Sequence, residues 1–286
     1  MTLKAEKVLR DGDNRVALTR TPWRVRGELR PFVAGQTVVV RFFRNGRKVD
    51  ERTEQLRSIR GGAAGEFLTP FRSGSVGRVT VSAVHLATPE LDTVRSEKVR
   101  VNVMRPELGG AITRLLQKHL AKLRYAVSRS GVYDDATARA VMAYRKVGGM
   151  ARSYSVSESI IRRVLAGKGA FKAKYPRDGR HVEADISRQV LALVNRRGRV
   201  HRVYHTSTGA PATPTVIGRF RTYRKSPGTN AKGMVHSSYF IRGYAIHGYA
   251  SVPAYNASHG CLRVPIPNAW SIYNWVRMGT VVRVYP

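Results

Sequence analysis

The sequence predicts a multidomain chain in which an all-β sandwich (residues 1–104) precedes a small α-helical domain (105–178) and a mostly β C-terminal domain (179–286). Three observations predict this order. Apolar and polar residues alternate over residues 21–104, apolar residues then recur at helical spacing, and short apolar runs separated by glycine and proline return from His181 onward. A chain of 286 residues is long enough for two or three domains.

Alternating residues identify the strands of the first domain. A hairpin is expected at Asn45-Gly46, because this pair between apolar runs favours a tight turn. The alternating positions are Val38, Val40 and Phe42, then Val79, Val81 and Ala83, then Val99, Val101 and Val103. Short strands at this spacing are typical of an immunoglobulin-like sandwich, and the absence of a catalytic cluster favours a spacer role.

Helical periodicity marks the second domain. The first expected helix carries Ile112, Leu115, Leu116, Leu120 and Leu123. Asp134-Asp135 is expected to cap a second helix, and Ser155 with Glu158 forms a capping-box pattern before a third, which Gly167 ends. In the third domain, HVEADIS, QVLALV and VHRVYH predict strands, AWSIYNWVRM predicts a helix and TVVRVY a last strand.

Positive charge is spread along the whole chain. The net charge is +33, of which the three domains carry +9, +11 and +13. This distribution favours attraction to a polyanion such as nucleic acid, a cell-wall polymer or a membrane surface over one docking groove, although an arginine-rich proteome would also produce it. No basic stripe interleaved with aromatic residues occurs, so we do not expect nucleic acid as a partner.

Membrane and targeting signals are not visible. No run of about 18 apolar residues occurs, so no membrane-spanning helix is expected. The start, MTLKAEKVLR, lacks the apolar core of a secretory signal. Either the protein acts in the cytoplasm, or a leader precedes the printed sequence.

The single cysteine of the chain lies in the stretch SHGCLR, at Cys261. A nucleophilic cysteine reacts as the thiolate, and an imidazole that takes its proton gives a thiolate–imidazolium pair. In an extended segment His259, Cys261 and Arg263 point to the same side, so a base candidate and a cation lie beside the sulfur. Gly260 permits a tight turn in which its amide and that of Cys261 can face an oxyanion.

A second histidine competes with His259 for the role of base. His247 follows an apolar run and precedes a glycine, fourteen residues before Cys261, and the spacing alone does not choose between them. The last 107 residues contain only two carboxylates, Glu183 and Asp185. A Cys-His-Asp triad is therefore improbable, although the fold could still bring in Asp185.

The catalytic histidine is expected to be oriented by a hydrogen bond to a backbone carbonyl, to Ser258 or to Asn256. His247, His259 and Cys261 could instead supply three zinc ligands. A fourth ligand of clear spacing is missing, and Arg263 would be unfavourable beside a dication, so we expect neither metal nor cofactor. A buried, unreactive cysteine is the remaining alternative.

The helical segment resembles the peptidoglycan-binding repeat found beside many cell-wall enzymes. Two positions depart from the pattern: Asp134 stands where a second glycine is usual, and Arg145 replaces a common glutamine. The matching residues are Leu116-Gln117, Leu120, Gly131-Val132-Tyr133, Thr137, Ala140-Val141 and Tyr144. The alternative is a helical connector.

Residues 180–286 resemble the L,D-transpeptidase catalytic domain of the YkuD type. The resemblance rests on IHG followed by SHGCLR, on the upstream STG, TPT and GRF motifs, and on GTVV near the end. One departure is the spacing from Thr213-Pro214 to Gly218, which is two residues longer than usual and affects the expected shape of the pocket entrance.

The resemblance implies a role for each motif residue. Cys261 is the nucleophile, and His247, held by a backbone carbonyl, is the general base and acid. The oxyanion wall would comprise His259, Gly260 and Cys261. The substrate-binding residues would be Arg263, Ser258, Gly248 and Tyr249.

The resemblance also implies a reaction: Cys261 attacks the L-diamino acid–D-Ala bond of a peptidoglycan tetrapeptide stem, and the thioester passes to an amine of another stem, cross-linking the wall. Expected partners are peptidoglycan stems and glycan, anionic wall polymers, and carbapenems as acylating inhibitors. The protein would then act outside the membrane. Two alternatives stay open, an L,D-carboxypeptidase that uses water, and a wall-binding module with little catalysis.

Overall fold

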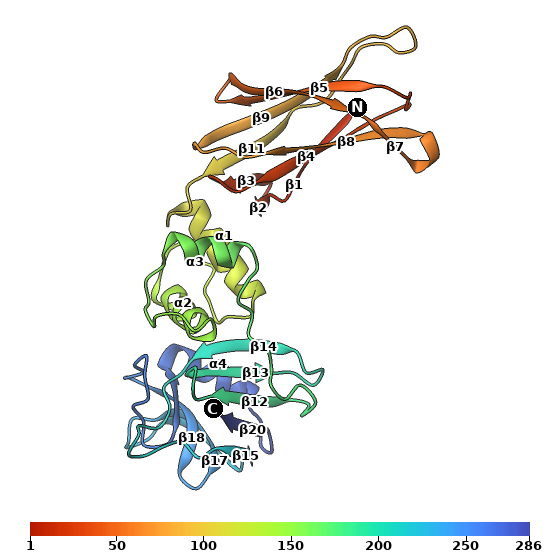
Figure 1. The fold of residues 1–286 in the computed structure, drawn as a ribbon. Helices are drawn as coiled ribbons and strands as arrows, with labels where there is room; N and C mark the ends of the chain where they lie inside the picture. The colour runs from red at the N-terminus through yellow and green to blue at the C-terminus, as the bar shows by residue number, and fades with distance from the viewer. The chain divides into compact units, whose positions relative to one another are not determined.

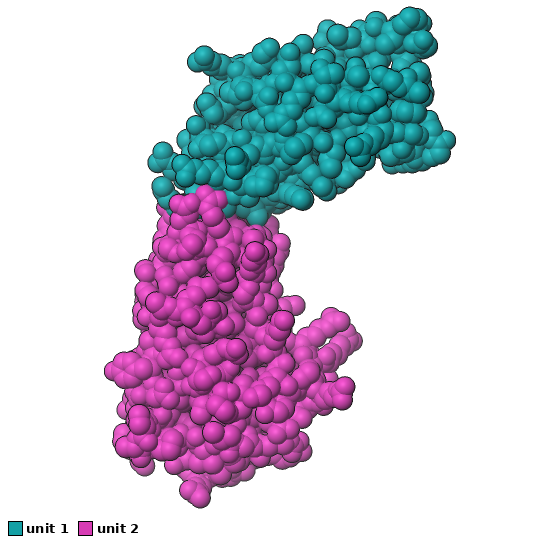
Figure 2. All heavy atoms as spheres, in the orientation of Figure 1, with its two compact units in different colours: residues 1–107 teal, residues 108–286 magenta.

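The structure is a computed structural model that describes residues 1–286, and the chain divides into two compact units, residues 1–107 and residues 108–286 (Figure 2). Strands dominate both units, and four α-helices all lie in the second (Figure 1). None of the helices has the length and apolar character needed to cross a membrane.

The first unit is built from two sheets. One contains, in order, β1 (Thr2–Glu6), β4 (Trp23–Leu29), β8 (Ala64–Phe71) and β7 (Arg57–Ile59), with the 3-10 helix η1 (Arg60–Gly62) after β7. The other contains β2 (Leu9–Asp11), β3 (Asn14–Leu18), β11 (Val99–Met104), β9 (Gly77–His85), β5 (Thr37–Arg44) and β6 (Arg47–Gln55), with β10 (Val94–Arg95) paired to β9.

A single core joins these two sheets. The rings of Phe42 on one sheet and Phe71 on the other stack with centroids 4.3 Å apart, and Trp23 packs edge-on against both. The alternating residues point into this core because successive strand side chains face opposite sides. Asn45 and Gly46 form the predicted turn with φ of 50° and 88°. The immunoglobulin-like assignment stays a prediction.

Three helices open the second unit: α1 (Gly110–Lys122), α2 (Asp135–Val147) and α3 (Glu158–Leu165). Asp134 caps α2 as expected, accepting a 2.8 Å hydrogen bond from the Thr137 amide. The structure corrects the cap of α3, where Ser157 rather than Ser155 accepts from the Ile160 amide at 3.4 Å. Gly167, with φ of 72°, follows the last turn of α3 as expected.

Two further sheets and a helix complete the second unit. The first sheet has the order β14 (Val200–His205), β13 (Val190–Val194), β12 (His181–Asp185), β20 (Val281–Tyr285) and β15 (Gly218–Arg221). The second has the order β16 (Arg224–Thr229), β17 (Val235–Ile241), β18 (Tyr244–Tyr249) and β19 (Leu262–Pro265), and α4 (Ile266–Trp275) follows β19. One core contains residues of both sheets and of α4, so the sheets form a single body.

The helical segment shares a core with the first of these sheets. Tyr125, which is fully buried, packs with Tyr144 of α2 and with Val190 and Val203 of the sheet. The Tyr125 hydroxyl donates a 2.6 Å hydrogen bond to the Gly169 carbonyl. Residues 108–286 therefore form one compact unit, and the division at residue 178 between a peptidoglycan-binding-like and a catalytic domain stays a prediction.

Candidate active site

Parallel pairing of β18 with β19 brings the sequence motifs IHG and SHGCLR together. The register places His247 opposite Arg263, and Cys261 directly precedes β19. Cys261, His247 and Arg263 all line one cavity, so the three side chains border the same space. Strand pairing thus places a histidine beside the only thiol of the chain.

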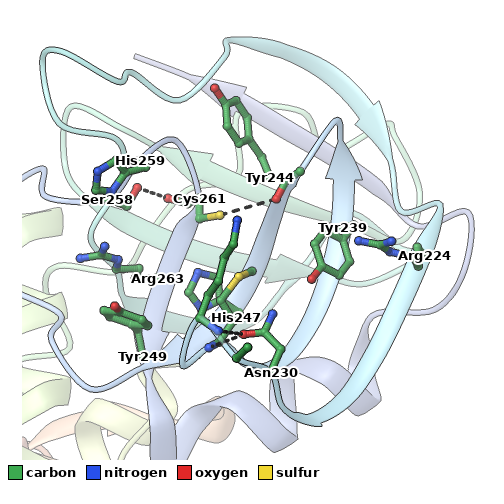
Figure 3. Close-up of a pocket in the computed structure, with 14 residues that line it drawn as sticks. Arg224, Asn230, Tyr239, Tyr244, His247, Tyr249, Ser258, His259, Cys261 and Arg263 are labelled. Carbon is green, nitrogen blue, oxygen red and sulfur yellow. Dashed lines mark hydrogen bonds between the residues drawn. The ribbon is translucent and has the colours of Figure 1, made fainter.

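A cavity of about 750 Å³ opens over this pair (Figure 3). Strands β18 and β19 and the hairpin formed by β16 and β17 all contribute to the wall of this cavity. The lining residues are Arg224, Asn230, Ala231, Lys232, Met234, Tyr239, Gly243, Tyr244, His247, Tyr249, Ser258, His259, Cys261 and Arg263.

Cys261 is partly buried, and its thiol is close to two backbone groups. The Ala245 amide donates to Sγ at 3.5 Å, and Sγ lies 4.0 Å from the Gly243 carbonyl oxygen. Burial raises the pKa of the thiol above its ordinary value, and this outweighs the opposing effects of the Ala245 amide, Arg263 and Lys232. The raised pKa favours a neutral thiol at rest, whereas the sequence favours a thiolate–imidazolium pair.

His247 is 3% exposed, and one of its ring nitrogens has a fixed partner. Nδ1 lies 2.9 Å from the Gly248 carbonyl oxygen, which only accepts, so Nδ1 carries the proton and Nε2 is left as a base. Burial lowers the pKa of His247, with a smaller contribution in the same direction from Arg263. The imidazole is consequently neutral near pH 7 and able to accept a proton.

The turn before Cys261 differs from the extended segment expected from its sequence. Ser258 Oγ donates to the Cys261 carbonyl at 2.6 Å and accepts from the Gly260 amide at 3.2 Å. Gly260 has φ of 105°, and a Cβ there would lie 2.6 Å from the Tyr244 ring. His259 consequently does not alternate with Cys261 along a strand, and its side chain is exposed at the cavity wall.

The four expected substrate-binding residues have different positions. Ser258, Tyr249 and Arg263 line the cavity, and the Arg263 guanidinium lies 4.2 Å from the centroid of the Tyr249 ring. Gly248 is buried and does not line the cavity. A Cβ at this position would lie 2.7 Å from Ala269 of α4, so the glycine permits close packing of that helix.

Part of the cavity wall was not recognised in the sequence. Arg224, Lys232, Met234 and Tyr239 belong to β16, β17 and the loop between them. The sequence signal for this part of the wall was a hairpin pattern just upstream of IHG, in which Gly228 and Gly233 mark the turn. Both glycines have positive φ in the structure, Gly228 near the end of β16 and Gly233 in the loop before β17. The position of this hairpin over Cys261 depends on sheet pairing and is not visible in that pattern.

Glu183 and Asp185, the two carboxylates of residues 180–286, form hydrogen bonds away from the cavity. Glu183 accepts from the amides of Lys174 and Tyr175 and from the Tyr285 hydroxyl, and Asp185 accepts from Ser187 and Arg188. Neither lines the cavity. No group of three or more His, Cys, Asp or Glu residues is arranged to hold a metal ion.

Comparisons with known proteins identify the family of this chain. Residues 179–284 match the family model of the YkuD L,D-transpeptidase catalytic domain. An L,D-transpeptidase from Xylanimonas cellulosilytica is 30% identical, with 62% of this chain and 94% of that chain covered and a TM-score of 0.53. No curated protein matches the chain.

Two other solved structures are more distant. An L,D-transpeptidase from Stackebrandtia nassauensis is 18% identical, with 63% of this chain and 94% of that chain covered and a TM-score of 0.39. An L,D-transpeptidase in complex with imipenem is 14% identical, with 98% of each chain covered and a TM-score of 0.33.

The fold and the cavity define a β-rich enzyme with a single thiol at its site. The chain belongs to the L,D-transpeptidase family, and residues 179–284 correspond to the catalytic domain of that family.

Proposed function

We propose that this enzyme cleaves the L-diamino acid–D-Ala bond of a peptidoglycan tetrapeptide stem through a Cys261 thioester and transfers the acyl group to an amine of another stem. One observation carries the proposal. His247, with Nδ1 anchored on the Gly248 carbonyl and Nε2 unprotonated, lies beside Cys261 in one cavity. A neutral base next to a neutral thiol suits both half-reactions.

In the first half-reaction, Nε2 of His247 takes the proton from Sγ as the sulfur attacks the carbonyl carbon. The tetrahedral intermediate collapses, and its C–N bond breaks while the imidazolium returns the proton to the leaving nitrogen of D-alanine. The thioester and a neutral imidazole remain. In the second half-reaction an amine attacks the thioester, the imidazole takes its proton, and the departing sulfur is reprotonated.

The turn of residues 258–261 supplies amides near the developing oxyanion. Gly260, at φ of 105°, directs the backbone around the thiol. Its amide donates to Ser258 Oγ at 3.2 Å in the free enzyme, so Ser258 orients the turn, and this N–H would have to leave Oγ in order to donate to the oxyanion. Arg263, positioned on the Tyr249 ring, would hold a carboxylate of the substrate.

The remaining parts of the chain fit a wall enzyme. The helical segment would hold the enzyme on glycan, and the first unit would act as a spacer. The net charge of +33 would attract phosphate-rich or carboxylate-rich wall polymers. The site of action is then extracytoplasmic. A carbapenem would acylate Cys261, since imipenem binds a member of the family.

Intact mass after incubation with a carbapenem tests the nucleophile and the base. Wild type should gain one adduct, Cys261→Ala should gain none, and His247→Ala should react far more slowly than His259→Ala. No adduct on wild type would contradict the proposal and favour a binding module.

Product analysis with and without an acceptor stem then separates transfer to an amine from hydrolysis. A cross-linked product supports the transpeptidase, and a tripeptide alone in the presence of acceptor supports the L,D-carboxypeptidase.

A further inference from the structure

The wall of the active-site cavity carries three permanent positive charges and no negative charge. Arg224, Lys232 and Arg263 line it, and no Asp or Glu does. Arg224 is contributed by β16 and Arg263 by β19 (Figure 3). Lys232 is contributed by the loop between β16 and β17. Three separate segments of the chain thus contribute charges of the same sign to one cavity wall.

Aromatic rings, rather than carboxylates, hold the two guanidinium groups in place. Arg224 lies 4.0 Å from the centroid of the Tyr239 ring, and Arg263 lies 4.2 Å from that of Tyr249. A ring face orients a guanidinium by a cation–π contact but does not neutralise its charge. The positive charges are therefore positioned and remain available to a ligand.

The nearby acids are already paired with other groups. Within residues 178–286, salt bridges join Asp185 to Arg188, and Asp178 to Arg219 and Arg283. Glu183 is buried among two amides, His181 and a tyrosine hydroxyl. None of these carboxylates lines the cavity, so none of them lies against its cations.

We infer that Arg224 and Lys232 are specificity-determining residues that select donor stems whose diamino acid carries a free side-chain carboxylate. This inference rests on the proposed function. The carbonyl attacked by Cys261 belongs to that diamino residue, so its side chain enters the same cavity. Amidation of the carboxylate removes one negative charge from a site with uncompensated cations, and the amide loses the charge-assisted hydrogen bonds.

Initial rates of D-alanine release from two tetrapeptides test the inference. One contains meso-diaminopimelate at the third position, and the other contains the same residue with its side-chain carboxylate converted to a carboxamide. Wild type should release D-alanine about tenfold faster from the free acid, the effect of one charge pair in a partly solvated site. This preference should shrink at high salt, because salt screens partly exposed charges.

Single variants assign the preference to the two residues. Arg224→Gln and Lys232→Gln should each lower the ratio of the free-acid rate to the amide rate severalfold, and an effect on Cys261 itself would change both rates by the same factor and leave this ratio intact. The rate with the amide shows that each variant is folded and competent. Arg197→Gln removes one charge from an exposed turn outside the cavity and should preserve the wild-type ratio.

The possible outcomes separate the inference from the function on which it rests. Equal rates with the two peptides in wild type would overturn the selection for a free carboxylate and leave the transpeptidase reaction intact. A preference that survives in both variants would overturn the assignment to Arg224 and Lys232. Release from neither peptide would overturn the proposed function, and the inference with it.

Discussion

Lys146 of α2 donates a 2.7 Å hydrogen bond to Nδ1 of His205 in the interior of the second unit. Nε2 of His205 donates in turn to the Val252 carbonyl at 2.8 Å, in the segment that leads to SHGCLR. Lys146 also donates to the carbonyls of Gln189 and Thr206. A helix side chain is thus connected to the chain segment before the nucleophile.

Removal of the Lys146 ammonium should destabilise the second unit strongly. Burial lowers the pKa of Lys146 to about 6, whereas its three acceptors match the three N–H bonds of an ammonium group and favour the charged form. Lys146→Met leaves these buried acceptors unpaired, so we expect the free energy of unfolding to fall by about 3 kcal/mol in urea titrations. Lys172→Met, at an exposed position, is the control. A loss below about 1 kcal/mol would show that the acceptors find other partners.

The stability of the second unit should decrease in acid through His205. Burial, followed by the charge of Lys146, lowers the pKa of His205 to about 3 from 6.5. Between pH 6.5 and 3, His205 is protonated in the unfolded chain but neutral in the folded chain. The free energy of unfolding therefore falls as pH drops through this range, by up to about 1.4 kcal/mol per pH unit. The difference in slope between wild type and His205→Gln, from denaturant titrations at several pH values, isolates this residue. If the free energy of unfolding had the same pH dependence in wild type and in His205→Gln, this prediction would be wrong.

Alkylation should show that Cys261 rests as a thiol. Burial raises its pKa above 9.0, and no other thiol is present in the chain. The rate of reaction with iodoacetamide, followed by intact mass, should therefore still increase with pH above 9 because only the thiolate reacts. A plateau reached near neutral pH would instead demonstrate a thiolate–imidazolium pair.

Replacement of Gly260 should disturb both stability and acylation. Gly260→Ala places a side chain at φ of 105° and 2.6 Å from the Tyr244 ring. We expect a loss of about 2 kcal/mol in the free energy of unfolding and much slower carbapenem acylation, because the turn that carries Cys261 must move. Gly243→Ala, whose Cβ position is open, should leave stability unchanged. Equal stability of the two variants would argue against strain at this turn.

Local patterns predicted most of the secondary structure. The alternation of Val38, Val40 and Phe42 identified a strand because only one face of that strand is buried, and Asp134 identified a helix start because its carboxylate satisfies a free amide. The cap of α3 was misplaced by two residues. Ser155 and Ser157 can both accept from an amide, and the choice depends on how the preceding chain packs.

The sequence by itself predicted the candidate reactive centre, because the unusual neighbours of Cys261 lie within a few residues of it, and the motif is local. Only the tertiary structure showed that His247 is buried in the same cavity wall as Cys261, that burial raises the pKa of the thiol, and that Arg224 and Lys232 also line this wall. Strand register, burial and uncompensated charge arise from contacts between distant segments. No spacing along the chain encodes them.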